Sequence, residues 1–323
     1  MIHPGGDPAA AERKRGGCRT VFLGTSDFAA TVLRRLAASE HRPQLVVSPP
    51  DRRRGRGRHM ASPPAVEAAR ELGIELLQTP DVNEPGAVER IVAATPDAVA
   101  VCAFGQLIKE PLLSDHLLLN VHPSLLPRWR GAAPIARAIM AGDRETGVSV
   151  MRVTAGLDSG PVALQERTPI APGEGWGSLS SRLADIGGEL LVRALELRRA
   201  GELEFRDQDD SVATYADKID PAERQLDPAR PAAELEATVR GLTPFVGAYL
   251  ELEDGRRLGV RSARAGEGEL EVGALDAEGG GLRLGCGEGV LTLDVVQPPG
   301  GRAMATEDFL RGHVVPARAR AAA

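Results

Sequence analysis

The chain has 323 residues, of which 42% are hydrophobic, 26% charged and 3% aromatic, and its formal net charge is −6. The length suits about two globular domains, and the composition is that of an ordinary globular protein. No apolar run approaches the roughly 20 residues of a membrane-spanning helix, and the acidic balance mildly disfavours a nucleic-acid partner.

The N-terminal residues are polar and small, without the apolar stretch of a secretory signal, and we expect residues 1–18 to be a disordered extension. The three cysteines (Cys18, Cys102 and Cys286) are far apart, which favours neither a disulfide framework nor a zinc site. Cys102 lies in an apolar run and is predicted to be a small buried side chain. We therefore expect a cytoplasmic protein that needs no metal.

Strands and helices alternate over the first two thirds of the chain. We expect strands over 20–23, 45–47, 98–104, 117–121 and 147–153 and helices over 28–38, 65–72, 134–140 and 179–200, with a loop over 48–64. The continuous apolar run at 98–104 is typical of a strand buried on both faces of a parallel sheet. This pattern predicts an α/β, Rossmann-like domain with right-handed crossovers.

The first turn of this domain, Gly24–Asp27, contains a single glycine, and no acidic residue ends the second expected strand. A dinucleotide fingerprint requires three glycines and an acid at those places, so no NAD or FAD site is predicted.

The character of the sequence changes after Gly201. Short alternating segments separated by turn residues follow, at 248–252, 259–262, 269–272, 282–284 and 289–296. They predict a smaller β-rich, OB-like barrel. We expect a first domain over 19–204, a linker over 205–220 and a second domain over 221–318.

Polar side chains end the strand expected at 117–121. Asn120 and His122 are two residues apart, so they point to one side of an extended chain at the strand end where α/β proteins bind ligands. Asp158 lies in a glycine-flanked turn and can orient His122 if that turn folds back over the strand ends. Two donors for an oxyanion and one proton acceptor suit direct acyl transfer to an amine. From the residues alone, a structural histidine and a turn-forming aspartate stay open interpretations.

A second cluster is basic. Five arginines lie among the seven residues 52–58, interleaved with glycine, and such a segment can reach RNA phosphates or an unpaired end. Only three of the 39 basic residues are lysine, so an arginine-biased composition is the alternative explanation of this cluster.

Longer motifs resemble one family. The run 120–135 (NVHPSLLPRWRGAAPI) closely resembles the signature of the methionyl-tRNA formyltransferase family, as does 156–160 (GLDSG). The segment 24–29 is similar to its opening turn, with Ser26 where the family usually has proline. Residues 50–57 are similar to its tRNA-contacting loop, and the likeness covers nearly all of residues 20–311.

The resemblance implies a formyltransferase catalytic domain followed by a tRNA-binding domain. The formyl donor would be 10-formyltetrahydrofolate, the acceptor would be the α-amine of methionine on initiator tRNA, and we expect a monomer. The catalytic trio would be Asn120, His122 and Asp158. Contacts to the folate would come from Phe104, Gly105, Leu107, Ser124, Leu125, Leu126 and Pro127. Contacts to the tRNA would come from Arg52, Arg54, Arg56 and Arg58, with Arg56 as the main one.

Two other functions are compatible with parts of this sequence. Glycinamide ribonucleotide and sugar-nucleotide formyltransferases share the Asn-x-His-x-Ser-Leu-Leu-Pro core but usually lack the run 129–135 together with a basic loop and a tRNA-type second domain. A non-catalytic RNA-binding protein on this scaffold would not need all three residues of the trio.

The second domain departs from the family in its charge. Residues 221–323 carry 16 acidic residues against 12 arginines and no lysine, whereas the family's tRNA-binding domain is usually more basic.

Overall fold

The computed structural model describes residues 16–54, 59–277 and 280–322, which fall into two compact units. The first unit combines the described residues up to Arg130 with Thr146–Thr168 and Ser180–Tyr215. The second combines Gly131–Glu145, Pro169–Leu179 and the described residues from Ala216 onward. Residues 205–215, expected as linker, therefore lie in the first unit. Of the extension expected over 1–18, residues 1–15 lie outside the described residues, whereas Cys18 is buried and its backbone N–H donates to His41, so the prediction was wrong for Cys18.

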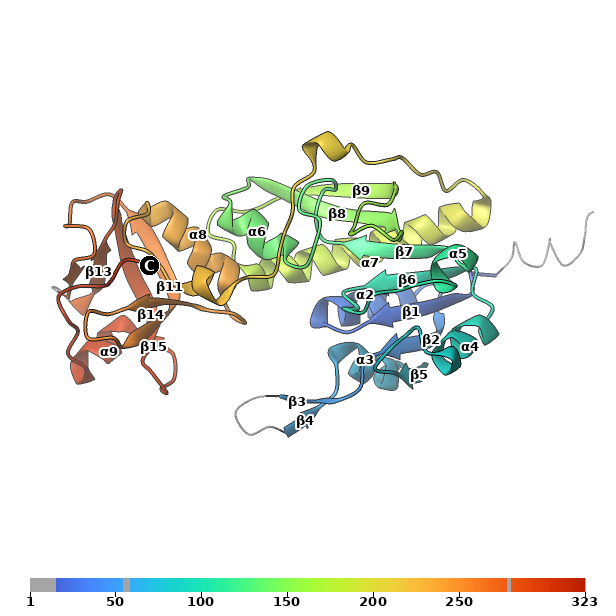
Figure 1. Cartoon of the computed structure of the whole chain (residues 1–323), viewed down its shortest axis with the longest axis horizontal. Helices are drawn as coiled ribbons and strands as arrows, with labels where there is room; N and C mark the ends of the chain where they lie inside the picture. The colour runs from blue at the N-terminus through green and yellow to red at the C-terminus, as the bar shows by residue number, and fades with distance from the viewer. Residues whose placement is uncertain (1–15, 55–58, 278–279, 323) are drawn as a thin grey trace, which may run out of the picture. The chain divides into compact units, whose positions relative to one another are not determined.

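The first unit is built on a seven-stranded sheet (Figure 1) with the order β5-β2-β1-β6-β7-β8-β9. Its strands are β1 (Thr20–Gly24), β2 (Pro43–Ser48), β5 (Glu75–Gln78), β6 (Ala98–Cys102), β7 (Leu118–His122), β8 (Glu145–Arg152) and β9 (Val162–Pro169). The pairs from β5 to β7 are parallel, and β8 runs antiparallel to β7.

Helices cover both faces of this sheet. They are α2 (Asp27–Ala37), α3 (Pro64–Leu72), α4 (Pro85–Ala93), α5 (Leu112–Asp115) and most of α7 (Trp176–Ala200). Alternate strand residues such as Val21, Val47 and Val99 form one core with Ile91 of α4 and Leu112 of α5. Every residue of β1 and β6 is buried, as the continuous apolar run predicts for strands covered on both sides.

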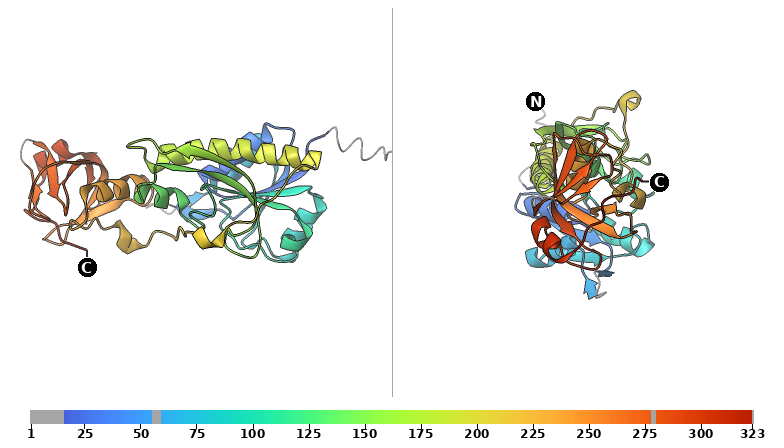
Figure 2. Two further views of the ribbon diagram at one scale, coloured as in Figure 1. Left: turned by 90° about the horizontal axis from the view of Figure 1, so that it is seen from above. Right: turned by 90° about the vertical axis from the view of Figure 1, so that its left-hand side faces the viewer.

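The long helix α7 lies along the sheet (Figure 2) and has two glycines at close contacts, Gly187 against β7 and Gly188 against α2. A Cβ atom on Gly187 would lie 2.7 Å from Cγ1 of Val121, and one on Gly188 would lie 2.6 Å from Cβ of Arg35. Glycine costs about 1 kcal/mol relative to alanine in a helix interior. Here that cost allows α7 to pack directly against the strand that carries Asn120 and His122.

The second unit is built on antiparallel strands in the order β10-β11-β14-β13-β12, with β15 paired to β14. Its strands are β10 (Ala248–Glu251), β11 (Arg257–Gly266), β12 (Leu275–Asp276), β13 (Leu282–Gly285), β14 (Val290–Gln297) and β15 (Met304–Ala305). Helices α6 (Pro134–Met140), α8 (Ala232–Leu242) and α9 (Thr306–Gly312) also belong to it. The predicted fold class is confirmed: a Rossmann-like parallel sheet is followed by a curled antiparallel sheet.

Some local predictions were wrong. The expected loop 48–64 contains two short strands, β3 (Arg52–Arg54) and β4 (His59–Ala61), which pair antiparallel. Residues 269–272 form no strand, and the nearest strand is β12. The prediction of a small buried side chain at Cys102 is confirmed, since it is fully buried.

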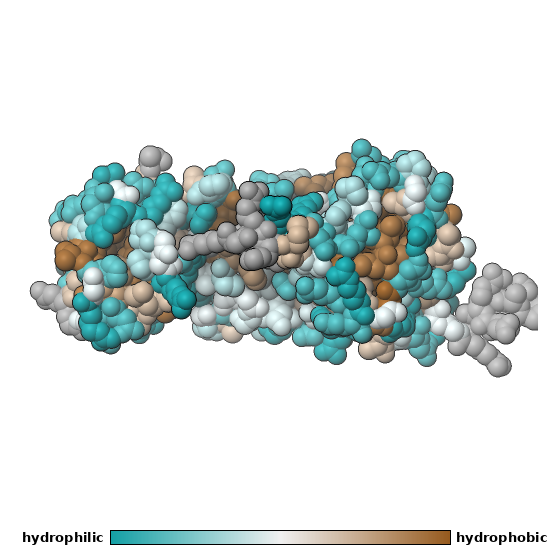
Figure 3. Space-filling model, turned by 90° about the horizontal axis from the view of Figure 1, so that it is seen from below, coloured by the Kyte–Doolittle hydropathy of each residue, from teal (hydrophilic) through white to brown (hydrophobic). Residues whose placement is uncertain are grey.

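The face shown in Figure 3 is largely hydrophilic, with hydrophobic residues in small groups. Among the described residues, no helix has the length and apolar character needed to cross a membrane.

A buried histidine makes the stability of the first unit depend on pH. His41 is 1% exposed, and its Nδ1 accepts a hydrogen bond from the backbone N–H of Cys18 at 2.8 Å. Burial, and then the charge of Arg199, hold the pKa of His41 below its ordinary value. The unfolded chain therefore binds this proton more readily than the folded one, and stability present above about pH 6.5 falls as the pH drops towards the folded pKa.

We expect the free energy of unfolding in urea to fall more steeply between about pH 7.5 and about pH 5.5 for the wild type than for His41→Asn. Asparagine keeps an acceptor near the position of Nδ1 but does not titrate in this range. His116→Asn, at a histidine that is not deeply buried, should retain the wild-type slope. Identical slopes for the wild type and His41→Asn would contradict this assignment.

Candidate active site

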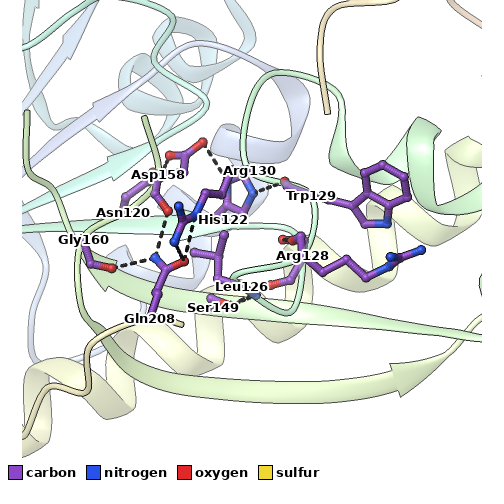
Figure 4. Close-up of polar contacts among 11 residues, drawn as sticks. Asn120, His122, Leu126, Arg128, Trp129, Arg130, Ser149, Asp158, Gly160 and Gln208 are labelled. Atoms are coloured by element: carbon purple, nitrogen blue, oxygen red, sulfur yellow. Dashed lines mark hydrogen bonds and ion pairs between the residues drawn. The ribbon is translucent and has the colours of Figure 1, made fainter. Parts of the chain in front are cut away.

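Three polar side chains meet where β7 ends (Figure 4). Asn120 and His122 project from β7 to the same side, and Asp158 reaches them from the turn between β8 and β9. The Asn120 amide donates to Oδ1 of Asp158 at 3.4 Å. Nδ1 of His122 lies 3.6 Å from Oδ2 of Asp158, and the two side chains are 5% and 18% exposed. Asp158 therefore contacts both other residues of the expected catalytic trio within a shielded site.

The hydrogen bond of Nε2 indicates which ring nitrogen of His122 carries a proton. Nε2 lies 2.9 Å from the backbone oxygen of Trp129, which can only accept a hydrogen bond, so Nε2 must carry a proton. Nδ1 then faces a carboxylate. The His122 ring is thus oriented with Nδ1 towards the Asp158 carboxylate.

The turn after β7 is held by its own hydrogen bonds. Ser124 is fully buried, and its hydroxyl donates to the Arg128 oxygen at 2.6 Å. The Ser149 hydroxyl donates to the Ser124 oxygen at 2.6 Å and accepts from the Leu126 N–H at 3.1 Å. The Ser124 hydroxyl, expected to contact the folate, is thus engaged within the protein. Leu126 and Pro127 line a cavity of about 510 Å³ that β9 and residues 202–209 complete.

The loop after β6 is equally well anchored. The Thr25 hydroxyl donates to the Phe104 oxygen at 2.8 Å, which ties this loop to the turn after β1. The Gln106 side chain bonds the backbone of Thr79 and Val82 at 3.0 and 2.7 Å. Phe104 is buried, whereas Leu107 is 68% exposed. The loop therefore presents Leu107 on a fixed support.

Two further residues of the site were missed from the sequence, Arg130 and Gln208. The Arg130 guanidinium is 3% exposed and donates to Oε1 of Gln208 and to Asp210. The Gln208 amide donates to the backbone oxygens of Asp158 and Gly160. Arg130 lies inside the motif 120–135, which could have drawn attention to it, but no periodicity or motif distinguishes Gln208 within a polar segment.

The basic segment is only partly described. Arg52 and Arg53 are exposed on β3, whose base is fixed by the Gln78 amide, a donor to the Asp51 carboxylate at 2.8 Å. Arg56 and Arg58 lie outside the described residues, as does the side chain of Arg54.

The arginines of the second unit mostly face acidic side chains of their own unit. Arg240 pairs with Glu236 at 2.6 Å, Arg256 with Asp254 at 2.7 Å and Arg264 with Asp294 at 2.7 Å. Such pairs neutralise the charge that a polyanion would otherwise meet.

No group of three or more histidine, cysteine, aspartate or glutamate side chains that could hold a metal occurs among residues 16–54, 59–277 and 280–322. The three cysteines are buried and unbridged, and burial raises the pKa of each thiol, to about 11 at Cys286. High thiol pKa values disfavour the reactive thiolate.

Comparisons with known proteins agree with the fold and the motifs. Residues 18–195 match the Formyl transferase family, and residues 218–314 match the Formyl transferase, C-terminal domain, family. The chain is 41% identical over 298 residues to a methionyl-tRNA formyltransferase of Methylobacillus flagellatus, covering 91% of this chain and 96% of that relative. It is 43% identical over 298 residues to the methionyl-tRNA formyltransferase of Halorhodospira halophila, with the same coverage.

The solved structures add a match in fold. HypX from Aquifex aeolicus in complex with tetrahydrofolic acid superposes with a TM-score of 0.65 at 17% identity, over 91% of this chain and 47% of that chain. The chain thus spans about half the length of HypX, and at this identity the likeness concerns the fold alone.

Proposed function

The chain belongs to the methionyl-tRNA formyltransferase family, which transfers a formyl group from a folate to Met-tRNA, and we propose that Asn120, His122 and Asp158 carry out this transfer here. The donor is 10-formyltetrahydrofolate and the acceptor is the α-amine of methionine on initiator tRNA. The chain acts as a monomer in the cytoplasm. The observation that carries the proposal is the direct contact of the three side chains at the end of β7.

Asn120 and His122 stabilise the oxyanion. When the amine attacks the formyl carbon, the carbonyl oxygen becomes negative, and donors already in place lower the barrier because they need no reorganisation. The Asn120 amide has two hydrogens, of which one points to Asp158 and the other serves the oxyanion. Nε2 of His122 is committed to the Trp129 oxygen, so Nδ1 is the nitrogen that serves the reacting groups.

Asp158 and His122 handle the proton together. The attacking amine must lose a proton, and N10 of the folate must gain one when its bond to the formyl carbon breaks. The pair accepts a proton from the amine and delivers one to N10, directly or through water, so it ends each turnover in its starting state. No covalent intermediate with the protein is required.

The loop 104–107 forms the apolar wall for the pterin. Leu107 supplies exposed apolar surface, and the bonds of Thr25 and Gln106 keep the loop in place before the folate arrives. The turn 124–127 contributes through Leu125, Leu126 and Pro127, whereas the Ser124 hydroxyl holds the turn closed.

The basic segment 52–58 binds the acceptor end of the tRNA. We expect Arg56→Ala to raise the KM for Met-tRNA several-fold and to reduce the slope of log KM against log salt concentration by about one, since one phosphate contact is lost. The KM for the folate should stay unchanged. Arg34→Ala removes the same charge from an arginine of α2 that pairs with Glu71, and it should leave both constants unaltered. An equal loss of folate affinity in Arg56→Ala would remove the assignment of this residue to tRNA.

The deciding experiment incubates the protein with 10-formyltetrahydrofolate and charged initiator tRNA and looks for N-formylmethionine. Formylation of a sugar nucleotide or of glycinamide ribonucleotide instead would overturn the proposed acceptor. A thermal-shift measurement separates the enzyme from a binding module: the enzyme is stabilised by a folate, and the module by tRNA alone.

A further inference from the structure

The segment after α7 returns to the active site and runs beside β9. Val162 and Arg206 exchange a pair of backbone hydrogen bonds at 2.8 and 2.9 Å, so this part of the segment extends the sheet by one short bridge. Two residues further on, the side chain of Gln208 points towards the turn that carries Asp158 (Figure 4).

The side-chain amide of Gln208 makes four hydrogen bonds, two as donor and two as acceptor. Its nitrogen donates to the Asp158 oxygen at 2.8 Å and to the Gly160 oxygen at 2.7 Å. Its oxygen accepts from Nε and a terminal nitrogen of Arg130 at 3.0 and 2.9 Å. Two donors and two acceptor sites are thereby filled, which makes this amide a rigid connection between the Arg130 guanidinium and the Asp158 turn.

The Asp158 turn needs such a connection. Asp158 has a φ of 44°, in the left-handed region that residues other than glycine adopt uncommonly, although aspartate and asparagine tolerate it better than most. Backbone in that region persists only where the surrounding structure holds it. The bonds from Gln208 to the oxygens of Asp158 and Gly160 bridge the turn on both sides of Ser159 and aim the carboxylate at Asn120 and His122.

The same segment also holds the other side of the site. The Thr214 hydroxyl accepts from the backbone N–H of Trp129 at 2.9 Å, and its backbone bonds Pro127 and Arg130 at 3.2 and 2.9 Å. The Trp129 oxygen is the group that fixes His122. Residues 208 and 214 therefore support both Asp158 and His122.

We propose that Gln208 is a positioning residue of the transfer reaction: it fixes the Asp158 turn and through it the carboxylate, while Thr214 fixes His122 through Trp129. This inference rests on the proposed function, because it assigns a consequence to the placement of Asp158. The Gln208 amide nitrogen bonds the backbone of the Asp158 turn and not the side chains of the trio, so we expect its loss to lower the rate of the chemical step more than the affinity for either substrate.

The test is the Gln208→Glu variant of the full chain, compared with the wild type in formylation of charged initiator tRNA. Glutamate has the same shape and still accepts from Arg130, but it has no N–H for the oxygens of Asp158 and Gly160. We expect kcat to fall about 10- to 100-fold, as for small displacements of a catalytic group, with both KM values within about threefold. Gln225→Glu makes the same chemical change in the second unit, where the amide donates to Ala321, and should retain wild-type kcat.

A double-mutant cycle separates positioning from general support of the fold. In an Asp158→Asn background, measured under single-turnover conditions, Gln208→Glu should change the rate less than about twofold, because its target is already removed. The full factor persisting in that background, or an unchanged kcat in Gln208→Glu alone, overturns the inference.

A second variant covers the case in which Gln208→Glu does not fold. Thr214→Val removes the acceptor for the Trp129 N–H but keeps the backbone bonds, and it should lower kcat about 3- to 10-fold at unchanged KM. A wild-type kcat in Thr214→Val overturns the part of the inference that concerns His122. A wild-type chain that forms no formylmethionyl-tRNA overturns the proposed function, whereas an active wild type with unaffected variants overturns only this inference.

Discussion

Replacing Asn120 by aspartate is expected to lower kcat by about three orders of magnitude, since a preorganised oxyanion donor is typically worth a factor of about 10² to 10³. Aspartate has the same size as asparagine, so the backbone of β7 and its packing against α7 should be preserved. It offers the developing oxyanion only acceptors, and it places a second carboxylate beside Asp158, where the amide now donates at 3.4 Å. Both effects act on the transition state.

Comparison among substitutions shows whether the lost donor causes the effect. Asn120→Ala should lose about 10²- to 10³-fold, and Asn120→Gln should be intermediate, because its amide is displaced by one methylene. The KM for the folate and for Met-tRNA should move by less than about threefold in all three variants. Steady-state formylation kinetics measure these constants. Activity in Asn120→Asp close to that of the wild type would exclude the amide as an oxyanion donor.

Much of the first unit could be predicted because its central strands are buried on both faces and therefore have continuous apolar sequences. β1 and β6 are covered on both faces, and such strands favour continuous apolar runs, which 21–23 and 98–102 present. The same reasoning fails at the margins of the sheet. β5 and β9 are the outermost strands of the sheet order and are mostly exposed or half-buried, and each combines a short apolar run with polar residues, which distinguishes it poorly from a loop.

The candidate site divides in a similar way. Asn120 and His122 could be placed together because strand geometry relates residues two apart. Asp158 is 36 residues beyond His122 in the numbering, so the residues alone placed it near His122 only on the condition that its turn folds back, and the resemblance to a family supplied the connection. Gln208 had no such signal, since its role depends on two backbone oxygens and an arginine that are distant in sequence. A contact between a side chain and a backbone group far away in the sequence produces no periodic pattern in the sequence.

Several acidic residues of the second unit pair with arginines of the same unit. Arg240, Arg256 and Arg264 pair with acidic neighbours of their own unit, so the excess of acid over arginine in this part of the chain coincides with internally neutralised arginines. Binding to a polyanion gains most from cations that are not already neutralised. Under the proposed function, the basic segment 52–58 of the first unit would then supply a large share of the attraction for tRNA.

The other large effect is expected for Asp158→Asn, which should lower kcat about 10²- to 10⁴-fold, the usual range for loss of a general acid or base. Asparagine is nearly isosteric with aspartate and tolerates the left-handed backbone that Asp158 adopts with a φ of 44°. The turn and its bonds from Gln208 should therefore survive, and the loss should reflect the missing carboxylate. Without it, Nδ1 of His122 has no carboxylate partner, and the amine has no acceptor for its own proton.

The kinetics of Asp158→Asn separate this role from substrate binding. The folate KM should stay within about threefold, whereas Asp158→Ala should lose additional activity because alanine is unfavourable at a positive φ. Asp115→Asn, an exposed aspartate beside Ser114, removes the same charge from the first unit and should leave kcat unaltered. A loss that appears in KM with kcat preserved would mean that the carboxylate binds substrate. In that case Asp158 would not take part in the transfer of a proton to N10 of the folate.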